Sequence, residues 1–183
     1  MAPMTERTFT CAECGFDASG LSDADLVSAC TSFVRKYRPP LTRFLSGEDG
    51  PSIVRRRPAP DVWSALEYAA HTRDVFDFYR ERIERVLAED RPMLRAVGFR
   101  DLAETAVYNE QDPAAVADGV TGAAAALAST LGGLDGEGWA RIGLASGGSG
   151  DERSVRLLAE RAVHDAAHHL LDIGRSLRAA RTA

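Results

Sequence analysis

The feature that most constrains the fold is residues 61–90, which contain neither glycine nor proline. Pro58 and Pro60 precede this stretch and Pro92 follows it. Apolar residues recur through it at the three- and four-residue spacing of one helix face: Val62, Leu66, Ala69, Ala70, Val75, Phe78, Ile83, Val86 and Leu87. An unbroken helix over this stretch is about 45 Å long. Such a helix buries its apolar stripe against partners of comparable length.

Three further segments carry the same helical pattern. The first starts at the N-cap Ser22 and is ended or kinked by Pro39-Pro40, with a further turn at residues 41–45. The second, residues 114–131, follows Asp112-Pro113, an N-cap residue and a first-turn proline. The last runs from residue 151 or 154 to about residue 180. Four helices predict an all-α fold, a four-helix bundle.

The connecting segments lack a hydrophobic period. Residues 93–111 form a mixed connector with a short strand or helical turn at 102–108, and the glycine-rich loop 134–150 holds a brief extended piece at 139–144. We expect no ladder of paired strands. The chain divides into an irregular N-terminal arm with a Cys-x-x-Cys run, residues 1–20, and a metal-binding bundle domain, residues 21–183.

Charge and hydropathy exclude several classes of protein. The chain has 22 basic and 27 acidic residues and a net charge of −5, which argues against nucleic acid or an anionic membrane as a partner. We find no stretch that approaches the roughly 20 apolar residues of a membrane span, and the N-terminus lacks a signal peptide. Three cysteines are too few for a disulfide framework. These features predict a cytoplasmic protein.

The histidines are the strongest functional signal. His164 and His168 lie four residues apart, so both imidazoles occupy one face of the last helix, which is the spacing that offers two nitrogens to one metal ion. His71 lies at a matching depth of residues 61–90 if the two helices pack antiparallel. We therefore predict a three-histidine metal site. A His-x-x-x-His pair also occurs by chance on exposed helix faces, and His169 is expected at the bundle rim, as a support for the ligands or facing solvent.

Carboxylates accompany these histidines on both helices. Glu160 and Asp172 continue the i, i+4 row of the last helix, while Glu67 and Asp74 flank His71. Such carboxylates usually accept the second ring N–H of a metal-bound imidazole. Glu67 and Glu160 are thus candidate general bases or supporting residues, and either one is alternatively a direct ligand.

Three motifs together resemble the DinB-like superfamily. They are Trp63-Ser-Ala-Leu-Glu-Tyr-Ala-Ala-His71-Thr-Arg-Asp74, Trp139-Ala-Arg-Ile-Gly143 in the glycine-rich loop, and His164-Asp-Ala-Ala-His168-His169-Leu-Leu-Asp-Ile173. The resemblance extends from Ser22 to the C-terminus. It implies an up-down-down-up bundle and a divalent metal, zinc or nickel, held by His71, His164 and His168. That superfamily includes bacillithiol and mycothiol S-transferases and mycothiol-dependent maleylpyruvate isomerases.

The resemblance implies a metal-dependent enzyme acting on a small molecule. The leading interpretation is an S-transferase that activates a low-molecular-weight thiol, with mycothiol favoured over bacillithiol by the arginine- and alanine-rich composition of a GC-rich genome. A metal-dependent hydrolase is the alternative, with Glu67, Glu160 or Asp74 as general base. A non-enzymatic metal- or small-molecule-binding bundle also remains open. A homodimer is a further possibility.

The cysteines of the N-terminal arm suggest half of a zinc knuckle. Cys11 and Cys14 supply two thiols, but a structural zinc ion needs four ligands, and Cys30 is the only further cysteine. A complete site would have to take histidines from the three-histidine set. We therefore expect an arm packed against the bundle, as in some actinobacterial DinB-like proteins. The run Arg55-Arg56-Arg57 is expected to be a solvated linker.

Overall fold

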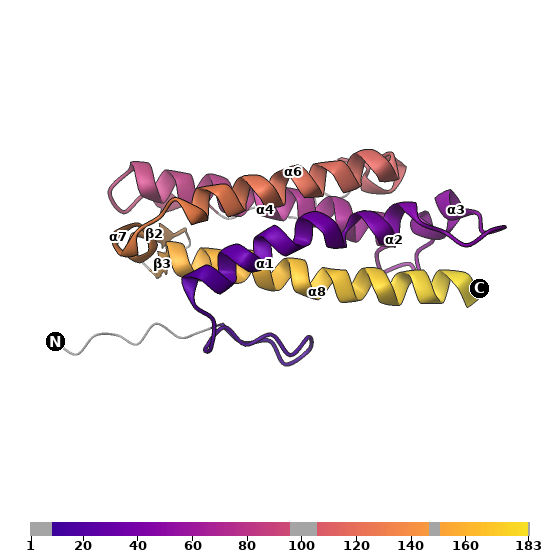
Figure 1. The fold of residues 1–183 in the computed structure, drawn as a ribbon, viewed down its shortest axis with the longest axis horizontal. Helices are drawn as coiled ribbons and strands as arrows, with labels where there is room; N and C mark the ends of the chain where they lie inside the picture. Colours follow the sequence, from indigo (N-terminus) through magenta and orange to yellow (C-terminus); the bar gives the residue numbers. More distant parts are fainter. Residues whose placement is uncertain (1–8, 96–105, 147–150, 183) are drawn as a thin grey trace.

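A computed structural model describes residues 9–95, 106–146 and 151–182. Its four long helices are α1 (Asp23–Lys36), α4 (Ala65–Ala88), α6 (Pro113–Gly132) and α8 (Val155–Thr182). Helices α1 and α4 each pack against both α6 and α8. As Figure 1 shows, α1 and α8 run in one direction and α4 and α6 in the other. The predicted up-down-down-up four-helix bundle is confirmed.

Helices α1 and α6 begin where the sequence predicts, because each start has a side-chain cap. Ser22 and Asp25 form a capping box at α1, and Ser64 and Glu67 form another at α4. Asp112 accepts a hydrogen bond from the third residue of α6. The long second helix is shorter than residues 61–90, since the Ser64 cap sets its first residue at Ala65.

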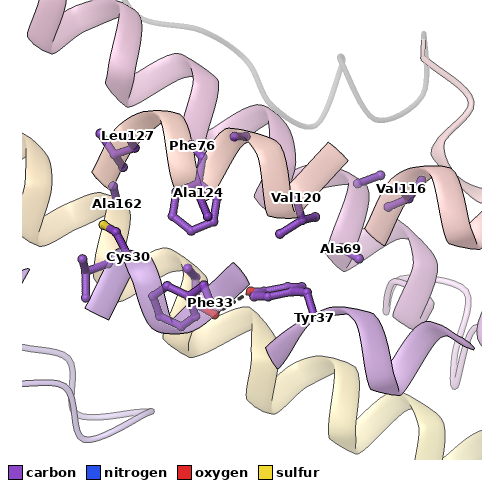
Figure 2. Close-up of a cluster of buried hydrophobic side chains, with 14 of the residues drawn as sticks. Cys30, Phe33, Tyr37, Ala69, Phe76, Val116, Val120, Ala124, Leu127 and Ala162 are labelled. Carbon is purple, nitrogen blue, oxygen red and sulfur yellow. Dashed lines mark hydrogen bonds between the residues drawn. The ribbon is translucent and has the colours of Figure 1, made fainter. Parts of the chain in front are cut away.

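The core lies between the four long helices. Figure 2 shows Phe33 of α1 and Tyr37, directly after α1, facing Phe76 of α4 and Val120 of α6, with the rings of Phe33 and Phe76 5.9 Å apart. Small side chains fill the remaining positions, such as Ala124 of α6. Alanines let helix backbones approach closely, which explains why α6 carries so many of them.

Shorter elements occupy the connectors. Helix α2 (Arg38–Thr42) has Pro39 and Pro40 in its first turn, so the prolines start a helix rather than only ending one. Helix α3 (Gly50–Arg55), capped by Asp49, was not predicted. Helix α7 (Gly136–Ala140) occupies the start of the expected extended piece. The expected structure at 102–108 lies partly outside the described residues, and η1 (Tyr108–Glu110) begins at its end.

A small sheet corrects the expectation of no strand ladder. Strands β1 (Met93–Leu94) and β2 (Ile142–Ala145) pair in parallel, and β3 (Glu152–Ser154) pairs antiparallel to β2. A side chain at Gly143 would overlap Leu94 and Val86, so glycine allows this sheet to pack against the end of α4. The sheet closes the end of the bundle where α8 begins.

Helix α6 has the length and hydropathy of a membrane span, with a mean hydropathy of 1.3. No other described helix passes that test. This finding corrects the expectation that no stretch approaches the length and hydropathy of a membrane span. In the structure α6 contributes Val116, Val120, Leu127 and Leu131 to the buried core and packs against α1 and α4. This packing buries 39% of its most apolar window.

Candidate metal centre

All four histidines of the chain form a continuous row of ring contacts that runs from α4 across α8. His71 extends from α4, while His164, His168 and His169 extend from the middle of α8. The ring centroids of His71 and His169 are 4.8 Å apart, those of His169 and His168 are 5.4 Å apart, and those of His168 and His164 are 5.4 Å apart. Antiparallel packing of α4 and α8 brings these residues together, as the matching depths predicted.

His71 lies inside the bundle. Its ring packs 5.2 Å from Trp63 and edge-on against His169, whose ring stacks on Tyr68. Burial, with a smaller effect of the His169 charge, lowers the pKa of His71 to about 4. The imidazole is therefore neutral at pH 7, the form that binds a metal ion. His169, expected at the bundle rim as a support for the ligands or facing solvent, has 19% of its side chain exposed and packs against His71.

His164 and His168 are each oriented by a carboxylate of their own helix. The Nδ1 atom of His164 lies 2.9 Å from an oxygen of Asp165, and Nε2 of His168 lies 3.4 Å from one of Asp172. A carboxylate at one ring nitrogen fixes the tautomer and directs the other nitrogen toward a ligand. Both rings are therefore arranged as metal-bound imidazoles commonly are.

The N-terminal arm lies against the same histidines. The ligand atoms of Cys11, Cys14, His164 and His168 all lie within 4.8 Å of one another. Burial raises the pKa of the Cys14 thiol, while backbone hydrogen bonding at Cys14 and the nearby His164 lower that of Cys11 to about 6. Cys-x-x-Cys and His-x-x-x-His are together the spacings of a zinc site. A complete site was not expected, because it takes histidines from the three-histidine set, yet its four candidate ligands lie close together.

Of the predicted three-histidine set, the structure brings His164 and His168 together. A second group of candidate ligands comprises His168, His169 and Asp172, again within 4.8 Å. Among the residues that the structure describes, His71 joins neither group. The set of His71, His164 and His168 therefore stays a prediction.

The family assignment follows from a match of the chain to a family model. The model described as the DinB superfamily matches residues 50–173, which include α4, α6 and all four histidines. The chain belongs to the DinB superfamily. The matched region begins after Cys11 and Cys14. No curated protein matches the chain.

A solved structure supports the same fold for this DinB-superfamily chain. It is YfiT from Bacillus subtilis, described as a probable metal-dependent hydrolase with an unusual four-helix bundle topology. The two chains share 13% sequence identity, and the match covers 87% of this chain and 90% of YfiT with a TM-score of 0.75. At this identity the likeness establishes the bundle and leaves the reaction open.

The candidate general bases of this DinB-superfamily member are held by arginines. Glu67 is buried in the α4 capping box and accepts hydrogen bonds from Arg57. Glu160 is buried beside Arg156, with a 3.0 Å ion pair. Asp74, the further candidate, accepts a hydrogen bond from the hydroxyl of Tyr108. These contacts of the three carboxylates are structural, and their catalytic role stays a prediction.

In the arginine run of residues 55–57, Arg56 and Arg57 are exposed, as expected of a solvated linker, but each of the three side chains also has a partner in the bundle. Arg55 donates to the carbonyl of Gln111 at 2.9 Å, and Arg56 donates to that of Ala180 at 2.9 Å. With Arg57 bound to Glu67, each arginine joins α3 or the segment after it to the bundle. These guanidinium groups have structural partners, so they do not form a free basic surface.

Proposed function

We propose that this chain is a metal-dependent enzyme whose ion is bound between α4 and α8. The observation that carries the proposal is the convergence of all four histidines into one row of ring contacts. Four imidazoles gathered from two helices are a donor set suited to a divalent metal ion. The description of YfiT as a probable metal-dependent hydrolase supports the same class.

His71 is the ligand on which this proposal depends. The set inferred from the sequence pairs it with His164 and His168, and the structure adds His169 as its nearest imidazole. Imidazole donors beside carboxylates match the preferences of zinc or nickel rather than those of magnesium or calcium. His71 is buried and neutral, so it can bind such an ion without first losing a proton.

Within this class we propose S-transfer from a low-molecular-weight thiol, such as mycothiol, as the leading reaction. A divalent ion with an open position would supply Lewis acidity, which lowers the pKa of a bound thiol or water. Asp172 would orient the imidazoles of α8, because it lies 3.2 Å from Nδ1 of His169 and 3.4 Å from Nε2 of His168. Hydrolysis is the second candidate, favoured by the description of YfiT.

The first test measures metal content and activity of the purified full chain and of His71→Ala. The wild type should hold zinc or nickel and consume a thiol with an electrophile such as monobromobimane. His71→Ala should lose this activity while keeping its helical circular dichroism. Ile83→Ala is the matched control, because it removes a buried side chain of α4 that has no donor atom.

Three outcomes separate the candidate reactions. Thiol consumption that depends on His71 supports S-transfer, and ester or amide hydrolysis without thiol supports a hydrolase. Neither activity in a metal-loaded protein contradicts the enzyme proposal and favours a binding role. We also propose that the protein acts in the cytoplasm on a small molecule, without nucleic acid or membrane partners.

A further inference from the structure

The described part of the N-terminal arm is a hairpin with the geometry of a metal-binding knuckle. Thr10 and Asp17 form an isolated antiparallel β-bridge, and the backbone N–H of Cys11 donates to the carbonyl of Phe16 at 2.8 Å. Gly15, directly after Cys14, has a φ of +74° and donates to the carbonyl of Cys11 at 2.9 Å. Glycine adopts this left-handed conformation without strain. The turn therefore presents both thiols on a short, hydrogen-bonded loop.

This hairpin packs directly on α8, outside the four-helix core. Figure 1 shows the arm on the side of α8 that faces away from α6. The rings of Phe9 and Phe16 lie 4.7 and 5.5 Å from the ring of His164, both edge-on. The guanidinium of Arg161 covers Phe9 at 4.9 Å. Aromatic packing thus holds the knuckle over the first histidine of the His-x-x-x-His pair.

One ring nitrogen of each histidine of the pair lies within 4.8 Å of the cysteine thiols. Asp165 occupies Nδ1 of His164, and Nε2 of that ring is buried with no hydrogen-bond partner among the residues that the structure describes. His164 exposes 9% of its surface. Asp172 lies at Nε2 of His168, while Nδ1 of that ring lies 3.8 Å from Sγ of Cys11. A buried nitrogen without a partner is costly unless a ligand is present.

We propose that Cys11, Cys14, His164 and His168 bind one zinc ion in a closed, four-ligand site that fastens the N-terminal arm to α8. Two thiolates and two imidazoles are a standard set for structural zinc, at the spacings Cys-x₂-Cys and His-x₃-His. In a tetrahedral site neighbouring ligand atoms are about 3.3–3.8 Å apart. Ligand atoms already within 4.8 Å need only small side-chain movements to reach that geometry.

The proposed zinc site goes beyond the proposed enzyme and changes its ligand set. With four protein ligands the ion has no open position for a substrate, so its role is structural. A ring nitrogen cannot bind two ions, and His164 and His168 would then be unavailable to His71. The ion of the enzyme would have to be bound by His71 and His169, which face each other on the α4 side of α8.

The test is metal binding by the full chain and three variants, read by metal analysis and by cobalt substitution. Cobalt with two thiolate ligands in a tetrahedral site gives strong visible bands and a near-ultraviolet thiolate-to-metal charge-transfer band. We expect this spectrum in the wild type, in His71→Ala and in Cys30→Ala, the matched cysteine control. The double variant Cys11→Ser/Cys14→Ser should lose the spectrum and one equivalent of zinc. His164→Ala should lose the spectrum as well.

Limited proteolysis gives a second reading. Removal of zinc should expose residues 9–21 to cleavage while helical circular dichroism is retained, because the four-helix core does not contain the ligand cysteines. Cobalt without a thiolate band, or zinc that is kept by the double cysteine variant and lost by His71→Ala, would overturn the proposal in favour of the three-histidine site. The enzyme proposal is tested independently of the zinc site: it is contradicted if His71→Ala keeps the activity of the wild type.

Discussion

Replacing Arg57 by glutamine should destabilise the start of α4. The carboxylate of Glu67 is buried, with 2% of the residue exposed, and accepts hydrogen bonds from Nε of Arg57 at 2.8 Å and from the backbone N–H of Ser64 at 2.9 Å. Nη2 of Arg57 also contacts it. The substitution removes both guanidinium contacts and leaves a buried anion held only by its capping box.

The magnitude follows from how much water can replace the arginine. Breaking a fully buried ion pair by removing one partner costs about 3–5 kcal/mol. Arg57 exposes 42% of its side chain, so solvent reaches the vacated position, and the capping-box hydrogen bonds to Glu67 persist. We therefore expect Arg57→Gln to lower the free energy of unfolding by about 1–3 kcal/mol at pH 7.

The loss of stability caused by Arg57→Gln should depend on pH in a direction that the pKa of Glu67 determines. Burial raises the pKa of Glu67, but hydrogen bonds from Arg57 and Ser64 outweigh it and lower the pKa below its ordinary 4.5. The resulting stabilisation is present above that ordinary value and is lost as the pH falls through the lowered pKa. Without Arg57 the pKa of Glu67 should rise. Acidification then protonates Glu67 of the variant at a higher pH than in the wild type and removes its buried charge. The difference between wild type and variant should therefore shrink on acidification.

Urea unfolding at pH 7 and at lower pH values measures this difference. Arg43→Gln is the matched control, because Arg43 is exposed, and we expect a change within about 0.5 kcal/mol. A double-mutant cycle with Glu67→Gln isolates the pair. If Arg57→Gln unfolds like the Arg43 control at pH 7, or if its deficit grows on acidification, the reasoning about the buried carboxylate is wrong.

Three further predictions test the core. Tyr37→Phe removes a buried hydroxyl that donates to the carbonyl of Ala166 at 2.6 Å, and should cost about 1 kcal/mol in urea unfolding. Leu127→Ala creates a cavity and should cost about 2–5 kcal/mol, whereas Leu171→Ala, at a residue 46% exposed, should cost less than about 1 kcal/mol. Burial raises the pKa of Cys30 to about 12, so iodoacetamide should label it in urea and not in the native protein, as peptide mass mapping would show.

The long helices could be predicted because their signals are local. A cap such as Ser22, Ser64 or Asp112 lies within three residues of the backbone group that it binds. The apolar spacing of each helix is likewise read within a few turns. The bundle follows from four such helices, since each apolar stripe must be buried. The matching depths of His71 and His164 were conditional on antiparallel packing of these two helices, which the contacts between α4 and α8 now show.

The remaining features depend on contacts between distant residues. Strand β2 forms because β1 and β3 present partners on either side of it, and neither two-residue β1 nor three-residue β3 has a period of its own. The guanidinium groups of Arg55 and Arg56 are bound by carbonyls of Gln111 and Ala180, far along the chain. A charged run next to a proline gives no indication of such partners, so the sequence favoured a solvated linker.

The two sides of α8 explain why the histidine pair was ambiguous in the sequence. His164 and His168 share one face, whereas His169 is rotated by about 100° and faces α4. Spacing shows that the pair can bind one ion, but not which element supplies the remaining ligands. A helix of the bundle was the nearer candidate, yet the arm carries two thiols to the same face. Substituting His164 or His168 would therefore disturb both proposed sites at once, so loss of activity in such a variant would not identify a catalytic ligand. His71 and His169 lie outside the cysteine site, and variants of these two residues test catalysis without unfastening the arm.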